Sequence, residues 1–327
     1  PFTPGGPDPW GGCWPGPGNT GVPAGTTLTP YVGSCTITTA GTVIDARTVD
    51  CSPLEVRASG VTITRSRLNG GVDIASDDCD TASVTITDSR VDLPAEVTTG
   101  NSGSTGILRC SFRVNRVEVT GGRRSIYCVR NCVIENSWVH DQGVDPQAKA
   151  HFSGIRMEQQ TTLRHNAITC EATRSGPGSG CSAGLTGYPD FAPVTDNLIE
   201  KNLFYRGGAG GSTVCAYGGA TGGKPYSRDP DNATRIRFIG NRFVRGSNGH
   251  CGNVGTILHF DASRPGNVWT DNGYDDGMAV SVTPIAAPLQ GSIRSVTIST
   301  ASLRAATDRS SHPRGTPGIA ALRPATP

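Results

Sequence analysis

A six-residue pattern of apolar and polar positions recurs along the middle of the chain. The first and sixth residues of each copy are apolar or aromatic, and the copies begin at Ile63, Ile86, Phe112, Ile134, Leu163, Ile199, Phe238 and Trp269. The fourth residue is a small side chain with a hydrogen-bonding group, namely Ser66, Ser89, Asn115, Ser137, Asn166, Asn202, Asn241 and Asn272. A repeat of this kind predicts stacked units, each of which buries its apolar face against its neighbours.

The conserved chemistry of the fourth position predicts a tight bend in every unit. A bend turns the chain away from its sheet, and a side-chain amide or hydroxyl can satisfy the peptide groups exposed there. Asn also tolerates the left-handed backbone conformation that such bends use. Stacked at the strand spacing of about 4.8 Å, the side chains can hydrogen-bond to one another as a ladder.

Two further stretches support a particular architecture. Thr42–Ala46 followed by Val56–Ile63, and Pro189–Val194 leading into Asn197–Asn202, resemble right-handed parallel β-helix proteins of the pectate-lyase-like superfold, in particular secreted bacterial members. The resemblance runs from about Val43 to Val280. It implies an all-β, right-handed parallel β-helix with about eight or more coils. The preference for Arg over Lys is typical of an actinobacterial member.

The regions outside the repeat predict a three-part organisation. We expect residues 1–40 to form an N-terminal cap, residues 41–280 the β-helix, and residues 281–327 a low-complexity tail in which Val296–Ile298 could add one strand. The cap contains Trp10, Cys13, Trp14 and Cys35. Exposed Trp rings also bind sugars, so sugar binding is the alternative interpretation of this aromatic pair.

The composition restricts the cellular setting. Eleven Cys residues are too many for a typical reduced cytosolic protein of this size and indicate a secreted, extracellular protein. A net charge of +2 gives no case for a nucleic-acid partner, and no apolar stretch predicts a membrane span. The sequence does not predict an oligomeric state.

Three cysteine pairings are suggested by position. Cys110 and Cys132 each precede a repeat copy by two residues, so stacking would bring them within disulfide range, although two buried thiols are equally consistent. Cys170 with Cys181 could close a loop, and Cys215 with Cys251 could join adjacent coils. An odd total leaves at least one thiol without a partner in the chain.

Ionisable residues are densest between His140 and Glu158, beside the longer insertions at 140–153, 169–195, 205–235 and 244–256. If Ile155 and Met157 point inward, Arg156 and Glu158 share the outer face of one strand. The candidate catalytic residues are His140, Asp141, Lys149, His151, Arg156 and Glu158. The structural alternative is a solvated loop with a surface Arg–Glu pair.

The mechanism depends on which of these groups converge. A lyase acting on a uronic-acid polymer needs a base and a positive charge near the sugar carboxylate, which His151, Lys149 and Arg156 could supply. A glycoside hydrolase needs two carboxyl groups at a defined separation, and Asp141, Asp145, Glu158, Asp190 and Asp261 are candidates.

Further residues are candidates for substrate binding, and one acidic segment is a candidate for Ca²⁺ binding. The substrate-binding candidates are Asp190, Tyr217, His259 and Asp261, although His259 could equally be a packed core residue. The acidic run Ser76–Asp80 could bind Ca²⁺, but a solvated turn is the preferred interpretation, and we expect no cofactor.

These observations predict an extracellular carbohydrate-active protein, a polysaccharide lyase or glycoside hydrolase that acts on an extended polysaccharide. The motifs Asn-Thr-Asp, Gly-His-Gly and Arg-Ile-Lys of polygalacturonases are absent from the sequence, as is a recognisable basic series of the calcium-dependent pectate lyases. The alternatives are a noncatalytic glycan-binding or matrix protein and, with less support, a phage-type spike.

Overall fold

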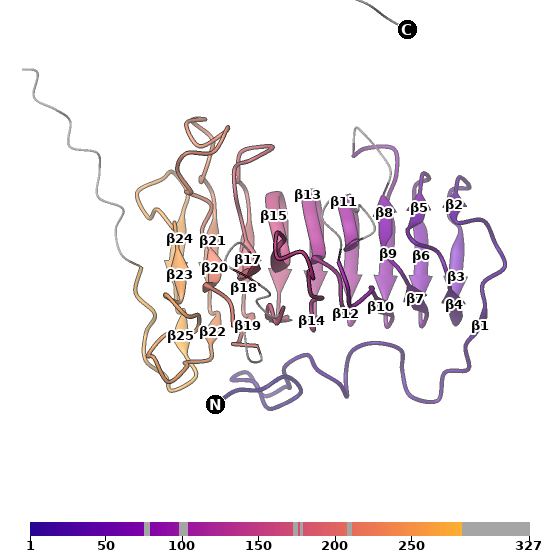
Figure 1. Ribbon diagram of the computed structural model, residues 1–327, viewed down its shortest axis with the longest axis horizontal. Coiled ribbons are helices and arrows are strands. Elements are labelled where there is room, and N and C mark those ends of the chain that lie inside the picture. The colour runs from indigo at the N-terminus through magenta and orange to yellow at the C-terminus, as the bar shows by residue number, and fades with distance from the viewer. Residues whose placement is uncertain (75–78, 98–103, 173–175, 177–178, 208–210, 283–327) are drawn as a thin grey trace, which may run out of the picture. The chain divides into compact units, whose positions relative to one another are not determined.

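The computed structural model describes residues 1–74, 79–97, 104–172, 176, 179–207 and 211–282. Within these ranges the protein is all-β, without an α-helix, and its strands pair in parallel in two sheets (Figure 1). This arrangement is compatible with a parallel β-helix. The chain alternates between the sheets, so strands that are neighbours in a sheet come from successive passages of the chain.

The first sheet has ten short strands in chain order. They are β1 (Thr29–Pro30), β4 (Arg47–Val49), β7 (Arg67–Asn69), β10 (Arg90–Asp92), β12 (Glu118–Thr120), β14 (Trp138–His140), β16 (Ala167–Ile168), β19 (Leu203–Phe204), β22 (Arg242–Phe243) and β25 (Gly273–Tyr274).

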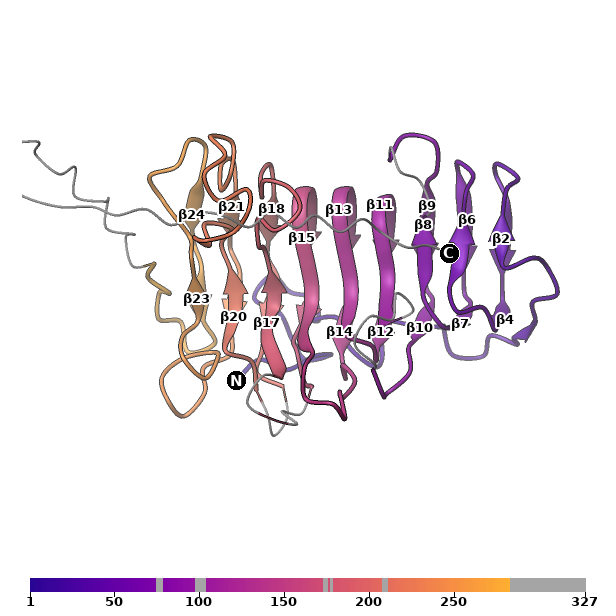
Figure 2. The same ribbon diagram turned by 45° about the horizontal axis from the view of Figure 1, so that its top comes forward.

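The second sheet has fifteen strands arranged in two rows that share three long strands (Figure 2). The shared strands are β11 (Thr105–Asn115), β13 (Arg124–Glu135) and β15 (His151–Arg164). One row adds β2 (Thr36–Ile37), β5 (Leu54–Val56), β8 (Val72–Ile74), β17 (Gly180–Thr186), β20 (Val214–Tyr217) and β23 (Ile257–Leu258). The other row adds β3 (Val43–Asp45), β6 (Val61–Thr64), β9 (Val84–Thr87), β18 (Leu198–Glu200), β21 (Arg237–Ile239) and β24 (Val268–Thr270).

The apolar positions of the repeat lie in the core between the sheets, as predicted. Ile63 pairs with Ile86, and Leu163 pairs with Ile199, which pairs in turn with Phe238. All five side chains are buried, and they belong to one continuous apolar cluster. Large side chains stacked on equivalent positions exclude water along the whole row, which is the main stabilising contribution of such a core.

The predicted Asn ladder is confirmed for the later copies. The Oδ1 atom of Asn202 accepts hydrogen bonds from the backbone N (3.0 Å) and Nδ2 (2.9 Å) of Asn166. Asn241 accepts from Asn202 in the same way, and Asn272 accepts from Asn241. The second proton of each Nδ2 goes to a backbone oxygen, for example that of Leu163 for Asn202 (2.9 Å). The amides of Asn202 and Asn241 therefore donate both protons and accept two hydrogen bonds each.

The predicted register of the third copy is wrong by two residues. Val114, not Phe112, pairs with Ile86 and Ile134, so Val117 stands at the fourth position and Asn115 lies outside the ladder. Both Phe112 and Val114 are buried. A shift of two residues keeps the inward–outward alternation of a strand, so the apolar pattern alone could not distinguish the two registers.

The left-handed residue also lies one position earlier than predicted. It is the third residue of the copies that has a positive φ, as at Arg65 (46°), Asn136 (48°), His165 (51°) and Lys201 (52°). The fourth residue follows this bend and supplies the hydrogen-bonding side chain. One residue therefore turns the chain, and the next satisfies the backbone of the turn.

Five disulfides link ten of the eleven Cys residues, and Cys13 is the free thiol. The pairs Cys170–Cys181 and Cys215–Cys251 are as predicted. The other pairs are Cys35–Cys51, Cys79–Cys110 and Cys128–Cys132.

The predicted Cys110–Cys132 pair is wrong, for the same reason as the register. The pairing of β11 with β13 shifts between Arg109 and Cys110, which places Cys110 beside Arg130 and Cys132 beside Phe112.

Within the described residues, no helix is long and apolar enough to cross a membrane. The disulfides and this finding are compatible with a secreted protein.

The N-terminal segment packs along the ten-stranded sheet (Figure 1). Trp14 is completely buried against Ala167 of β16 and Leu203 of β19, so its ring is closed to a sugar. Trp10 is partly exposed and has Lys201 Nζ 5.2 Å from its ring centroid. The boundaries at 40 and 280 remain a prediction, and the tail from residue 283, with Val296–Ile298, lies outside the described residues.

Candidate functional site

Three neighbouring strands of the fifteen-stranded sheet place Tyr127, Arg156 and Thr186 in one row, because Tyr127 of β13 pairs with Arg156 of β15, which pairs with Thr186 of β17. Ile155 and Met157 are buried in the core, so Arg156 and Glu158 point to the opposite side together, as predicted. They do not form a solvated pair, since their side chains are only 5% and 1% exposed. Residues beyond the strand must therefore cover them.

Arg156 is covered by the segment that follows β17. Its Nη2 atom donates to the backbone oxygen of Tyr188 (3.2 Å), to Asp190 Oδ2 (3.1 Å) and to Glu158 Oε1 (3.3 Å). The other oxygen of Asp190 lies 3.0 Å from Lys224 Nζ. One guanidinium thus connects the sheet to the covering segment, and Asp190 bridges two cations.

Glu158 is buried beneath the contact of Arg156 with Tyr188 and Asp190. The Tyr127 hydroxyl donates to its Oε1 atom, while its Oε2 atom is buried without a partner among the described residues. Burial raises the pKa of Glu158, although the hydrogen bond from Tyr127 and the charge of Arg156 oppose the change. Burial and the charge of Glu158 raise the pKa of Tyr127. Burial therefore shifts both groups towards their neutral forms.

Three arginine side chains influence one another near the start of β13. Arg123 and Arg124 are half-buried beside Arg156, and within the described residues Arg124 forms no ion pair. Burial and the charges of Arg123 and Arg156 lower the pKa of Arg124 to about 10. Burial also lowers the pKa of Arg123. We call Arg123, Arg124 and Arg156 the arginine cluster.

Aromatic rings surround the arginine cluster and extend from it. The Arg156 Cζ atom lies 5.1 Å from the ring centroids of both Tyr127 and Phe191, and Phe191 is 66% exposed. The Tyr188 ring lies 4.9 Å from that of Tyr217, which stacks on His259 at 5.6 Å. Burial lowers the pKa of His259, so its imidazole is neutral at neutral pH. The candidates Asp190, Tyr217 and His259 therefore belong to one connected surface.

The structure places three other candidates differently. His151 is exposed at the start of β15, and its backbone oxygen accepts a hydrogen bond from Arg123 Nε (3.1 Å). Lys149 is exposed, and its backbone N donates to the buried Asp145 (2.7 Å). Asp261 accepts hydrogen bonds from the backbone N and the hydroxyl of Ser263 within a local turn. Asp145 and Asp261 therefore both hold local backbone turns in place.

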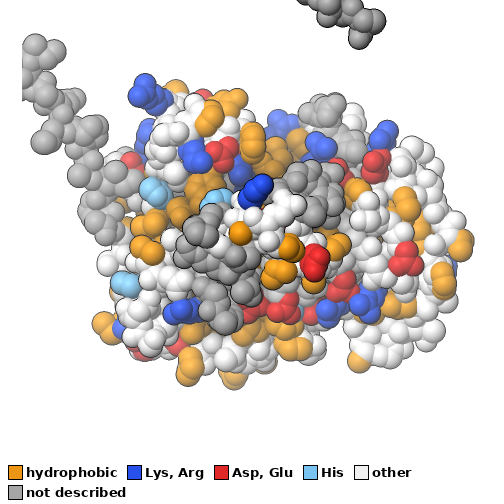
Figure 3. Space-filling model, viewed as in Figure 1, with side chains coloured by type: hydrophobic (Ala, Val, Ile, Leu, Met, Phe, Trp, Pro, Cys, Tyr) orange, Lys and Arg blue, Asp and Glu red, His pale blue; other side chains and the backbone are white. Residues whose placement is uncertain are grey.

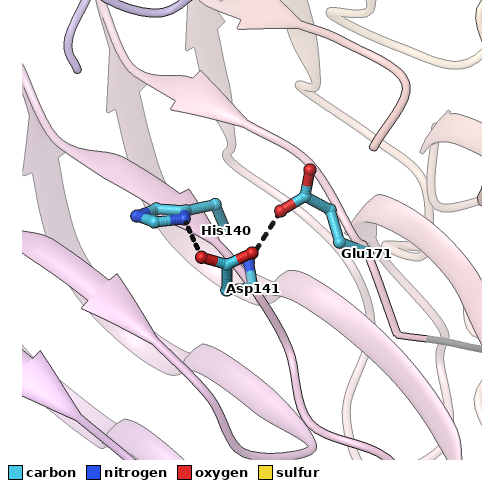
Figure 4. Close-up of side chains that lie close together, drawn as sticks. All are labelled: His140, Asp141 and Glu171. Atoms are coloured by element: carbon cyan, nitrogen blue, oxygen red, sulfur yellow. Dashed lines mark hydrogen bonds and ion pairs between the residues drawn. The ribbon is translucent and has the colours of Figure 1, made fainter. Parts of the chain in front are cut away.

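His140 and Asp141 belong to a second group on the other sheet (Figure 4). Imidazole Nδ1 of His140 lies 2.9 Å from Asp141 Oδ2, and Nε2 lies 3.1 Å from Glu118 Oε1. The backbone N of Asp141 donates to Glu171 Oε2 (2.9 Å). Burial and the nearby charge of Asp141 raise the pKa of Glu171. The prediction of one cluster from His140 to Glu158 is therefore wrong, because β14 and β15 lie in different sheets.

Among the participants that sequence reasoning missed are Arg123 and Arg124 of the arginine cluster, Tyr127 beside it, and Glu118 and Glu171 near His140. Tyr127 could have been found, because it precedes Ile134 by as many residues as Arg156 precedes Leu163, its ladder equivalent. Glu171 follows β16 on a loop, where the repeat gives no register. Of the calcium candidates, Ser76–Asp78 lie outside the described residues, and Asp80 is ion-paired with Arg130 (3.4 Å).

No family model matches the sequence, and neither the curated proteins nor the solved structures searched contain a significant match.

Proposed function

We propose that the protein is a secreted, right-handed parallel β-helix of about eight or more coils that acts as a lyase on an extended acidic polysaccharide. The arginine cluster would hold the uronate carboxylate. The parallel rows of strands, the Asn ladder and the five disulfides support the fold and the extracellular setting. A regular sheet face suits an extended chain of sugars.

The observation that carries the proposal is the unmatched positive charge at Arg124. Burial, and after it the repulsion of Arg123 and Arg156, destabilises the charged Arg124 guanidinium, as its lowered pKa indicates. A carboxylate would relieve this repulsion and can accept two parallel hydrogen bonds from one guanidinium. The exposed Phe191 ring beside Arg156 would give the sugar an apolar surface.

The carboxyl groups favour a lyase over a hydrolase at this site. Glu158 is sealed from solvent, and Asp190 is ion-paired with both Arg156 and Lys224. Neither is placed to serve as one of the two carboxyl groups that flank a glycosidic bond. Elimination instead needs a neutralised substrate carboxylate and a base.

The base has to lie within hydrogen-bond reach of the C5 proton, which is next to the carboxylate. His151 adjoins the cluster, because its backbone oxygen accepts a hydrogen bond from Arg123 Nε (3.1 Å), whereas Tyr188 and Tyr217 separate His259 from Arg156. The raised pKa of Tyr127 makes that phenol a poor base. In the reaction the base takes the C5 proton, the C4–O bond breaks, and a C4–C5 double bond forms. The departing sugar oxygen takes up a proton.

The test is incubation of the purified protein with a panel of uronic-acid polysaccharides, followed by ultraviolet detection of unsaturated products and a reducing-end assay. We expect unsaturated products that decrease by at least about a hundredfold in Arg124→Gln. Arg65→Gln is the matched control, because Arg65 is exposed and ion-paired with Asp45 elsewhere on the sheet. New reducing ends without unsaturation would show a hydrolase instead.

A noncatalytic glycan-binding protein is the second candidate. It is favoured by one observation, that Arg156 already forms ion pairs with Glu158 and Asp190. Binding of an acidic polymer without any cleavage would select this candidate. If the protein neither binds nor cleaves any polymer in the panel, both candidate functions are refuted.

A further inference from the structure

We propose that His140, Asp141 and Glu171 bind one divalent transition-metal ion, of which Zn²⁺ is the probe of choice. The three side chains lie close together (Figure 4), and His140 belongs to the ten-stranded sheet, whereas Arg124 and Arg156 belong to the other sheet. One ligand atom from each lies within 4.8 Å of the others. Such a spacing lets all three atoms contact a single ion with small side-chain adjustments.

The negative charge near these residues is only partly balanced by basic side chains. Glu118, Asp141 and Glu171 bring three carboxylates together. Of these three, Arg90 pairs with Glu118 alone (2.9 Å), and its other partner is Asp92 (2.6 Å). Among the described residues, no Lys or Arg forms an ion pair with Asp141 or Glu171. In Figure 3 several acidic side chains gather on this face of the molecule, with basic side chains beside them. A divalent ion would balance the two carboxylates that have no basic partner.

His140 is oriented as a metal-ligating histidine is. Its Nε2 atom is held by Glu118 at 3.1 Å, and its ring stacks on Trp138 with centroids 3.5 Å apart. Metal-bound histidines characteristically donate their second nitrogen to a carboxylate, which fixes the ring and the tautomer. The remaining Nδ1 atom then turns its lone pair towards the carboxylate of Asp141, 2.9 Å away. That contact is favourable only with a proton or a metal ion between the two atoms.

A buried hydroxyl beside the cluster supplies independent support. Thr169 follows Ile168, the partner of Val139, and so lies next to His140 on the outer side of the sheet. Its side chain is 1% exposed, yet Oγ1 has no hydrogen-bond partner among the described residues. A buried hydroxyl without a partner costs about 1–3 kcal/mol. Water carried by a bound ion would supply the missing partner.

The backbone fixes Glu171 in position. The backbone N of Glu171 donates a hydrogen bond to Gln142 Oε1 (2.9 Å). Its side-chain Oε2 atom accepts one from the backbone N of Asp141 (2.9 Å). Gly207 packs so closely that a Cβ atom there would lie 1.9 Å from Glu171 Cγ. Any side chain at position 207 would therefore displace the carboxylate.

The donor set favours a transition metal over Ca²⁺. One imidazole nitrogen and two carboxylates are typical ligands of Zn²⁺, whereas Ca²⁺ takes six to eight oxygen atoms. Asp141 is exposed, so the fourth position would be open to solvent. The site is separate from the proposed polysaccharide site, and its test uses no glycan.

The experiment is calorimetric titration of Zn²⁺ into tag-free, chelator-treated protein, with thermal unfolding as a second measurement. We expect one equivalent to bind and to raise Tm, because an ion that binds only the folded state stabilises it. Glu171→Gln and Asp141→Asn should each weaken binding at least about tenfold, and Glu118→Gln should weaken it by about ten- to a hundredfold. Thr169→Val should weaken it less.

Asp271→Asn is the matched control, because its side chain is 69% exposed, against 68% for Asp141. It should bind Zn²⁺ like the original protein. The proposal is overturned if no stoichiometric binding occurs. It is also overturned if the three cluster variants bind like Asp271→Asn, which would show adventitious binding elsewhere on the surface.

Discussion

At the scale of single residues, Glu158 is an acid beside the arginine cluster whose pKa is raised by burial. It lies on the outer side of its strand, yet Arg156 and the segment carrying Asp190 seal it from water. The alternation of β15 predicted that Arg156 and Glu158 share a face, and this is correct. It could not predict burial, because the covering residues come from a loop more than twenty residues further along the chain, at Tyr188 and Asp190.

The raised pKa of Glu158 predicts a particular dependence of stability on pH. The unfolded carboxyl has a pKa near 4.5 and the folded one a higher value, so the folded state retains a proton that the unfolded state loses. Stability should therefore be greatest below about pH 4.5, as far as this group is concerned, and should fall as pH rises through the folded pKa. Glu158→Gln should remove this part of the dependence.

The measurement is Tm between pH 4 and 8 for the original protein, Glu158→Gln and the control Glu200→Gln, whose side chain is partly exposed on β18. We expect a shallower fall of Tm with pH in Glu158→Gln alone. Parallel curves for all three proteins would contradict the burial of an ionisable Glu158.

At the scale of elements, the ladder explains why separate short strands stay in register. Asn202 uses both Nδ2 protons and accepts two hydrogen bonds at Oδ1, all within the buried interior. The sequence predicted this device correctly because the Asn residues recur beside apolar positions. It failed at Asn115, where a two-residue shift leaves the apolar alternation unchanged.

Replacement of Asn202 by Ala should therefore destabilise the protein by about 3 kcal/mol or more, because several buried backbone and side-chain groups lose their partners. Asn115→Ala is the matched control. Asn115 lies outside the ladder and accepts one side-chain hydrogen bond, from Asn136 Nδ2 (2.9 Å). The Asn115→Ala substitution should lower the free energy of unfolding by less than about 1 kcal/mol, measured by denaturant unfolding. Equal losses for the two variants would indicate that Asn115 belongs to the ladder and would contradict the register.

The disulfides should differ in their contributions according to the loops they close. Cys215 and Cys251 are 36 residues apart, whereas Cys128 and Cys132 are 4 apart, and all four are buried. Chain entropy then predicts a loss of about 4 kcal/mol for the double Ala variant of the first pair and about 2 kcal/mol for the second. Cys13→Ala should change the free energy of unfolding little. The reverse order in denaturant unfolding would show that local packing outweighs loop closure.

At the scale of the whole described molecule, the two candidate sites lie on different sheets. The sequence placed His140 and Glu158 in one dense segment, but β14 and β15 belong to different sheets, so their side chains lie apart. The repeat predicted an all-β protein of parallel strands because each copy carries its own apolar and hydrogen-bonding positions. It carried no information on the loops, and Lys224, Glu171 and Phe191 all lie on loops.

The central claim is that the arginine cluster takes an anionic polymer. The most direct measurement compares the binding of polygalacturonate with that of its fully methyl-esterified form, which has the same backbone without the charges, at low and high salt. We predict that the charged polymer binds at least about tenfold more tightly, that salt reduces the difference, and that Arg124→Gln abolishes it while Arg65→Gln does not. Equal binding of the two polymers, or a preference that survives Arg124→Gln, would contradict the claim.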